Sequence, residues 1–132
     1  FLDTEFAESR KEIQRRISVL RRGHPLPRIK NRTVIIIDEG ITKGATMQSI
    51  INMCRKSHAR KIMVGVAVAS REVIDLITPK VDKMIALEKP LTFNSVSQVY
   101  QDWNPVEESD VPDIIDSILH SENYYRQSRE VA

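Results

Sequence analysis

The feature that most constrains the fold is an apolar run, Val34–Ile37, that leads directly into the acidic pair Asp38 and Glu39. All four apolar residues are β-branched and show no polar alternation. This pattern predicts a strand buried on both faces of a parallel sheet. Small and polar residues follow the acidic pair, and an amphipathic run begins near Met47. The segment therefore predicts a strand, an acidic turn, a short loop and the N-terminus of a helix.

The predicted helix and the loop before it have several features of an anion-binding site. The helix has apolar residues at positions i, i+3, i+4 and i+7, namely Met47, Ile50, Ile51 and Cys54. A helix N-terminus offers unpaired N–H groups and a positive dipole end, both of which favour phosphate. Gly40 and Gly44 allow close backbone approach and positive φ angles. Thr42 and Thr46 add hydroxyl donors, while Lys43 either adds charge or points to solvent.

The acidic pair indicates what would be bound next to the phosphate. Asp38 and Glu39 would repel a phosphate, but carboxylates accept hydrogen bonds from vicinal hydroxyls and stabilise positive charge on a sugar ring. Ribose 5-phosphate carries both a phosphate and vicinal hydroxyls. A structural interpretation stays open, in which one carboxylate caps the turn and the threonines are turn and cap residues.

Two other phosphate-binding motifs are excluded by the spacing of the glycines. A Walker A loop requires Gly-x4-Gly-Lys, and the position five after Gly40 is Ala45. A dinucleotide fingerprint requires two glycines that lie two positions apart, and the chain has no such pair.

The segment 34–46, VIIIDEGITKGAT, resembles the PRPP-binding motif of type I phosphoribosyltransferases: an apolar strand, two acidic residues and a T-x-G-x-T loop. From about residue 8 to residue 115 the chain also resembles a bacterial and archaeal group of predicted phosphoribosyltransferases. The supporting matches are the Arg/Glu-rich stretch 8–16, the Gly-x-Pro-x-Pro linker 23–27, the apolar strand 64–69, and a late segment with Phe93, Val96, Tyr100, Asp102 and Trp103.

The resemblance implies a fold and a reaction. The fold would be α/β, a parallel sheet flanked by helices that is similar to the C-terminal portion of a type I phosphoribosyltransferase and lacks its N-terminal strands. The reaction would transfer 5-phosphoribose from PRPP to a nitrogenous acceptor and release pyrophosphate. The resemblance assigns catalysis to Asp38 and Glu39 and PRPP binding to Asp38, Glu39, Gly40, Ile41, Thr42, Lys43, Gly44, Ala45 and Thr46. Mg²⁺ would be bound mainly through PRPP, without a dedicated protein metal site.

The late segment would form part of a hood over the acceptor in the resembling enzymes. Phe93 is a candidate for stacking on the acceptor base, while Tyr100 and Trp103 are expected to close the core at the edge of the sheet. Two positions depart from the motif, since Glu39 replaces the more common Asp and Lys43 replaces a small or hydroxyl residue. An alternative function is therefore a PRPP-sensing regulator without catalysis, and a third is a structural module.

In the resembling proteins, a preceding portion supplies the pyrophosphate-binding loop. We therefore expect the chain either to form a homo-oligomer or to pair with a missing N-terminal portion. A basic balance of nine Lys/Arg against four Asp/Glu in residues 1–32 fits a solvated, salt-bridged amphipathic helix better than a nucleic-acid surface. No apolar run approaches the length of a membrane span, and a cytoplasmic location is the expectation.

We expect one domain, 1–132, with a leading helix and linker (1–32), a core (33–88), a hood-like segment and C-terminal helix (89–121) and a tail (122–132). Strands are predicted at 34–37, 62–69 and 81–87. Helices are predicted at 2–22, 44–57 and 71–78, the last of them capped by Ser70, with a final helix capped by Ser109 or Asp110. The core face predicted for this final helix consists of Val111, Ile114, Ile115, Ile118 and Leu119.

Overall fold

A computed structural model of the chain describes the backbone of residues 2–118 and the side chains of residues 6–118. The chain divides into two compact units, one formed by Arg28–Trp103 and the other by Phe1–Pro27 with Asn104–Ala132. The prediction of a single domain stays a prediction, and Leu119 and the tail lie outside the described residues.

Strands and helices alternate in the unit Arg28–Trp103. The elements are β1 (Thr33–Ile41), α2 (Ala45–Lys56), β2 (Lys61–Ala69), α3 (Arg71–Ile77), the 3₁₀ turn η1 (Thr78–Lys80), β3 (Lys83–Glu88) and the 3₁₀ turn η2 (Val96–Gln98). The three strands form a parallel sheet in the order β1-β2-β3. The predicted α/β fold with a parallel sheet flanked by helices is confirmed.

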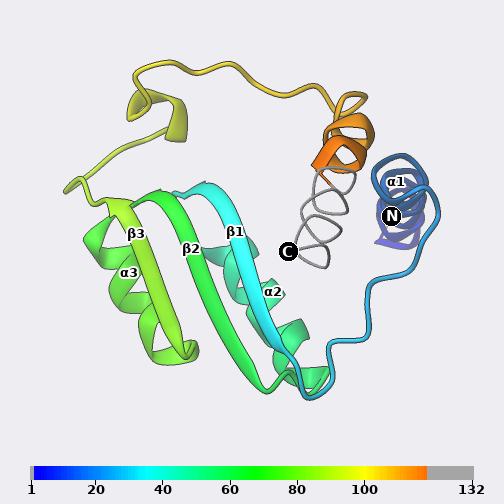
Figure 1. Cartoon of the computed structure of the whole chain (residues 1–132), viewed down its shortest axis with the longest axis horizontal. Helices are drawn as coiled ribbons and strands as arrows, with labels where there is room; N and C mark the ends of the chain where they lie inside the picture. Colours follow the sequence, from blue (N-terminus) through cyan, green and yellow to red (C-terminus); the bar gives the residue numbers. More distant parts are fainter. Residues whose placement is uncertain (1, 119–132) are drawn as a thin grey trace, which may run out of the picture. The chain divides into compact units, whose positions relative to one another are not determined.

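Helices α2 and α3 lie on the same face of this sheet (Figure 1). Both crossovers step in the same direction along the sheet, and right-handed crossovers that do so place their helices on one face. The core therefore forms between this face and the two helices. Its fully buried members include Ile51 of α2, Ile62 and Val64 of β2, and Ile77 of α3. Cys54 also lies in this core, as predicted, and burial raises the pKa of its thiol.

The opposite face of the sheet is exposed among the described residues. Ile35, Ile37 and Leu87 are 62%, 74% and 75% exposed. This differs from the prediction that the apolar run would be covered on both faces. The side chains of a strand alternate between faces, and both helices lie on one side, so only every second residue of β1 packs against them. A continuous apolar run therefore did not indicate double coverage here.

Local signals account for the starts of the elements. The Ser70 hydroxyl accepts a hydrogen bond from the Val73 N–H at 3.4 Å, which confirms the predicted cap of α3. That helix ends at Ile77, and Pro79 lies in the 3₁₀ turn that follows. At the start of β2, the Asp82 carboxylate accepts the Ile62 N–H at 2.8 Å. This hydrogen bond is the main reason why the pKa of Asp82 is lowered.

The other unit contains α1 (Leu2–Arg21) and helical residues 111–118. Arg15 pairs with Glu12 and with Glu108, each at 2.8 Å, as expected for a salt-bridged outer face. These ion pairs are largely exposed, so each contributes little to stability. Two large apolar side chains of this predicted amphipathic helix, Phe6 and Ile13, are exposed. Among the residues that the structure describes, we find no helix long and apolar enough to cross a membrane.

Candidate functional site

The acidic pair lies inside strand β1 rather than in a turn after it, because β1 continues to Ile41. Consecutive side chains of a strand point to opposite faces. Asp38 is half-buried and borders both a cavity on the side of α2 and an apolar hollow on the other side, whereas Glu39 is exposed and borders only the hollow. The predicted acidic turn is thus a strand end, and of its two carboxylates only that of Asp38 borders the cavity at α2.

The loop between β1 and α2 turns at Gly44. This residue has φ +78° and ψ −4°, a left-handed conformation that glycine adopts without steric cost. Gly44 is also the N-cap of α2, and no side chain caps the helix there. The first N–H groups of an uncapped helix keep their capacity for an external acceptor. The positive φ angle therefore brings an uncapped helix N-terminus to the carboxyl end of β1.

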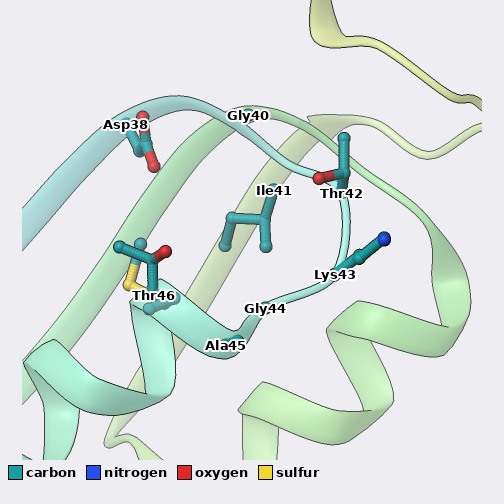
Figure 2. Close-up of a pocket in the computed structure, with 9 residues that line it drawn as sticks. Asp38, Gly40, Ile41, Thr42, Lys43, Gly44, Ala45 and Thr46 are labelled. Atoms are coloured by element: carbon teal, nitrogen blue, oxygen red, sulfur yellow. The ribbon is translucent and has the colours of Figure 1, made fainter. Parts of the chain in front are cut away.

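A cavity of about 360 Å³ lies at this junction (Figure 2). The hydroxyl groups of Thr42 and Thr46 and the carboxylate of Asp38 border it, while the Lys43 side chain points away from Asp38 and Thr46. The residues that line the cavity are Asp38, Gly40, Ile41, Thr42, Lys43, Gly44, Ala45, Thr46 and Met47. The structure therefore brings together every residue predicted to bind PRPP except Glu39. Met47 was assigned only to the helix core, where it is 2% exposed.

The ionisation of the acidic pair is unequal. Partial burial raises the pKa of Asp38 to about 6, and the adjacent Glu39 carboxylate adds to this rise. The pKa of Glu39 is lowered, first by its hydrogen-bonding interaction with the Asp38 side chain. The Glu39 N–H also donates to Asp38 Oδ1 at 2.9 Å. The last proton of the pair therefore resides on Asp38, the carboxyl group that borders the cavity.

Gly40 is required by close packing rather than by its backbone angle. A Cβ atom at this position would lie 2.6 Å from Val68 Cγ1 and 2.8 Å from Val96 Cγ2. Both distances are far below van der Waals contact, so any side chain here would displace a neighbour. The sequence pattern suggested a positive φ angle or an approaching anion, and the structure shows that η2 approaches instead.

The three aromatic residues of segment 93–103 differ in their contacts. The Tyr100 hydroxyl donates to the backbone carbonyl of Glu39 at 3.0 Å, a contact that sequence reasoning missed. Trp103 is 40% exposed and packs edge-to-face on Tyr100, with ring centroids 5.0 Å apart. Phe93 is half-buried and lines neither the cavity at Asp38 nor the hollow at Glu39. Its predicted role in acceptor binding stays a prediction.

The fold and site define a class: an α/β unit with an uncapped helix N-terminus at the carboxyl end of a parallel strand, where such sheets bind ligands. No protein-family model matches the chain. Over 105 residues it is 27% identical to proteins named "Putative phosphoribosyl transferase" from Mycobacterium tuberculosis strains CDC 1551 and H37Rv. Over 67 residues it is 35% identical to the transcriptional regulator GfcR of Methanosphaera stadtmanae.

A solved structure is similar as well. The crystal structure of TT1426 from Thermus thermophilus matches with a TM-score of 0.74 and 30% sequence identity over 86% of this chain. The matches cover 80% of this chain for the mycobacterial relatives and 51% for GfcR. The chain in turn spans 24% of each mycobacterial relative, 34% of GfcR and 54% of TT1426. It is thus similar to phosphoribosyl transferase-like proteins over a part of their length.

Proposed function

We propose that the chain binds PRPP and transfers its 5-phosphoribosyl group to a nitrogenous acceptor, with release of pyrophosphate. The observation that carries the proposal is the cavity in which the uncapped N-terminus of α2 lies next to the Asp38 carboxylate. The names of the mycobacterial relatives support the same reaction class. The motif resemblance at 34–46 narrows it to type I phosphoribosyltransferase chemistry.

In this proposal the loop holds the 5-phosphate. The N–H groups at the start of α2 donate to the phosphate oxygens, and the helix dipole favours the negative charge. The hydroxyl groups of Thr42 and Thr46 border the same cavity and add two donors. Lys43 points away from Asp38 and Thr46, so its charge contributes to the approach of the anion rather than to its coordination.

The acidic pair would hold the ribose. The carboxylate of Asp38 accepts hydrogen bonds from the ring hydroxyls, and its charge offsets the positive charge that develops at the anomeric carbon. Cleavage of a glycosidic bond passes through such an oxocarbenium-like state. Carboxylates are also ligands that Mg²⁺ accepts, alongside substrate phosphates and water. Asp38 or Glu39 would therefore supply at most one or two ligands to an Mg²⁺ ion carried mainly by the pyrophosphate of PRPP.

Titration calorimetry with PRPP and Mg²⁺ tests the binding step. The wild-type protein is expected to bind, and the Asp38→Asn variant to bind at least ten-fold more weakly, since hydrogen bonds to a charged group contribute about 1.5–3 kcal/mol. Asp75→Asn is the matched control, because Asp75 is an exposed carboxylate on α3 outside the cavity. Absence of any binding heat from the wild-type protein would refute the proposal.

A second experiment separates transfer from sensing. Pyrophosphate release is measured after a panel of purine and pyrimidine bases is added to the protein with PRPP and Mg²⁺. Release that depends on both an added base and Asp38 is the result expected of an enzyme. Tight PRPP binding without release from any base would instead identify the regulatory function that the sequence left open.

A further inference from the structure

Segment 93–103 contacts strand β1 at two points next to the acidic pair. The first contact is the packing of Val96, in η2, against Gly40. A Cβ atom at Gly40 would lie within 3 Å of both methyl groups of Val96, so the Val96 side chain occupies the space that a side chain at position 40 would need. The contact lies one residue beyond Glu39. It limits any movement of the strand end toward η2.

The second contact is the hydrogen bond from the Tyr100 hydroxyl to the Glu39 carbonyl. This carbonyl belongs to the peptide unit that joins Glu39 to Gly40. Tyr100 is half-buried, and its ring packs edge-to-face with that of Trp103. The bond therefore fixes the orientation of a peptide plane directly between the acidic pair and the binding loop.

The turn 94–99 contains Val96 and directly precedes Tyr100, and it is stabilised by its own hydrogen bonds. The Gln98 side-chain oxygen accepts the backbone N–H groups of Asn94 and Ser95, at 3.1 and 3.3 Å, and the Ser95 hydroxyl completes a capping box. A second turn bond runs from the Val99 N–H to the Val96 carbonyl at 3.1 Å. A locally ordered turn can hold a neighbouring strand end in place, whereas a free loop could not.

We propose that Tyr100 is a positioning residue for the acidic pair: with Val96 seated on Gly40, its hydrogen bond to the Glu39 carbonyl sets the direction of the Asp38 and Glu39 carboxylates. The part of this inference that concerns ribose binding rests on the proposed function. Rotation of the Glu39–Gly40 peptide plane changes the direction of the Glu39 side chain directly, and it reaches Asp38 through the hydrogen bond that the Glu39 N–H donates to Asp38 Oδ1. The N–H groups at the start of α2 lie beyond Gly44, so Tyr100 acts more strongly on the hydroxyl-binding half of the site than on the phosphate-binding half.

The first test needs no ligand. The carboxyl carbon of Asp38 is titrated by NMR in the wild type, in Tyr100→Phe and in Thr78→Val. Thr78 is the matched control, because its hydroxyl also donates to a backbone carbonyl, that of Ile74 at 2.7 Å, away from the cavity. Tyr100→Phe is expected to move the pKa of Asp38 from about 6 toward its ordinary value by about half a unit or more. Thr78→Val is expected to leave it in place.

The second test uses two probes, ribose 5-phosphate and inorganic phosphate, titrated against the same three proteins. Tyr100→Phe is expected to weaken the binding of ribose 5-phosphate about five-fold and that of inorganic phosphate less than about two-fold. The ratio of the two affinities is the readout, because a general loss of structure would weaken both. Val96→Ala is expected to change the ratio in the same direction.

The outcomes test the positioning role of Tyr100 separately from the proposed function. An unchanged Asp38 titration in Tyr100→Phe overturns the positioning role, whether or not any ligand binds. An equal loss of both probes overturns it as well, because Tyr100 would then act on the fold as a whole. Failure of the wild type to bind ribose 5-phosphate contradicts the proposed function alone, and the ligand-free titration still decides the role of Tyr100.

Discussion

The two faces of the three-stranded sheet are built from similar residues but differ in what covers them. On the face of α2 and α3, Ile62 and Val64 are at most 1% exposed. On the other face, Ile35 and Ile37 are 62% and 74% exposed. The candidate site lies at the strand end between the two faces, where Asp38 borders the cavity on the helix side as well as the hollow on the open side. Hydrophobicity alone therefore does not decide which face becomes the core.

The largest effect on stability is expected from truncating an isoleucine on the covered face of the sheet rather than on the open face. Ile62→Ala removes a fully buried side chain and should lower the free energy of unfolding by about 2–5 kcal/mol. Ile37→Ala removes a largely exposed side chain of the same kind and should change it by less than about 0.5 kcal/mol. Urea denaturation of both variants measures the difference. Equal losses would show that the open face is covered in solution.

The second contrast concerns the two carboxylates. Asp38 borders the cavity and Glu39 does not, so Asp38→Asn should weaken PRPP binding about thirty-fold and Glu39→Gln only about five-fold. Calorimetry with PRPP and Mg²⁺ measures both. If Glu39→Gln costs as much as Asp38→Asn, the ligand reaches across the strand end to the open face.

Two glycines with the same backbone angle provide a smaller contrast. Gly44 and Gly23 both have φ +78°, so replacing either by alanine should cost about 1 kcal/mol of local stability. Only Gly44 lies at the start of α2, so Gly44→Ala should also weaken PRPP binding several-fold. Gly23→Ala is the matched control for backbone strain. If Gly23→Ala also weakened PRPP binding, backbone strain in general would explain the defect, and the position of Gly44 at the start of α2 would not.

A pH dependence that originates at Asp38 is expected as well. Its pKa is raised from 3.8 to about 6, so the folded protein holds a proton that the unfolded chain has released between these values. The contribution to stability is complete below about pH 4 and is lost as the pH rises through 6. Thermal midpoints from pH 4 to 7 should show this decline in the wild type and not in Asp38→Asn.

PRPP binding should have the opposite pH dependence. A carboxylate accepts hydrogen bonds from ribose hydroxyls only when ionised, so affinity should fall by up to about ten-fold per unit below pH 6. The 5-phosphate itself loses charge near pH 6. Because this ligand effect persists in Asp38→Asn, the difference between the two proteins isolates the carboxyl group. Identical pH profiles would contradict the assignment of Asp38.

Much of the fold could be predicted because it depends on local patterns. The strand at 62–69 and the helix at 44–57 were predicted to within a residue, since the strand is a nearly continuous apolar run and the helix carries a clear hydrophobic period. The Ser70 cap was predicted because capping depends on residue types a few positions apart. The loop 40–46 was recognised for the same reason, and the structure places its residues around one cavity.

The remaining features depend on contacts between distant parts of the chain. Nothing in the run 34–37 shows that both helices would cover the same side of β1. Gly40 could not be assigned to close packing before Val96, 56 positions later in the chain, was placed against it. Tyr100 was expected at the sheet edge, and its hydrogen bond to the Glu39 carbonyl appears only once η2 is folded.

The sequence by itself determined the alternation of strands and helices, the loop of small and polar residues and the presence of two adjacent carboxylates, because each is set by neighbouring residues. The tertiary structure decided which carboxylate borders the cavity, which face of the sheet is covered and which residues brace the strand end. Those decisions follow from the direction of the crossovers and from packing across the sheet, which join residues that the sequence keeps far apart.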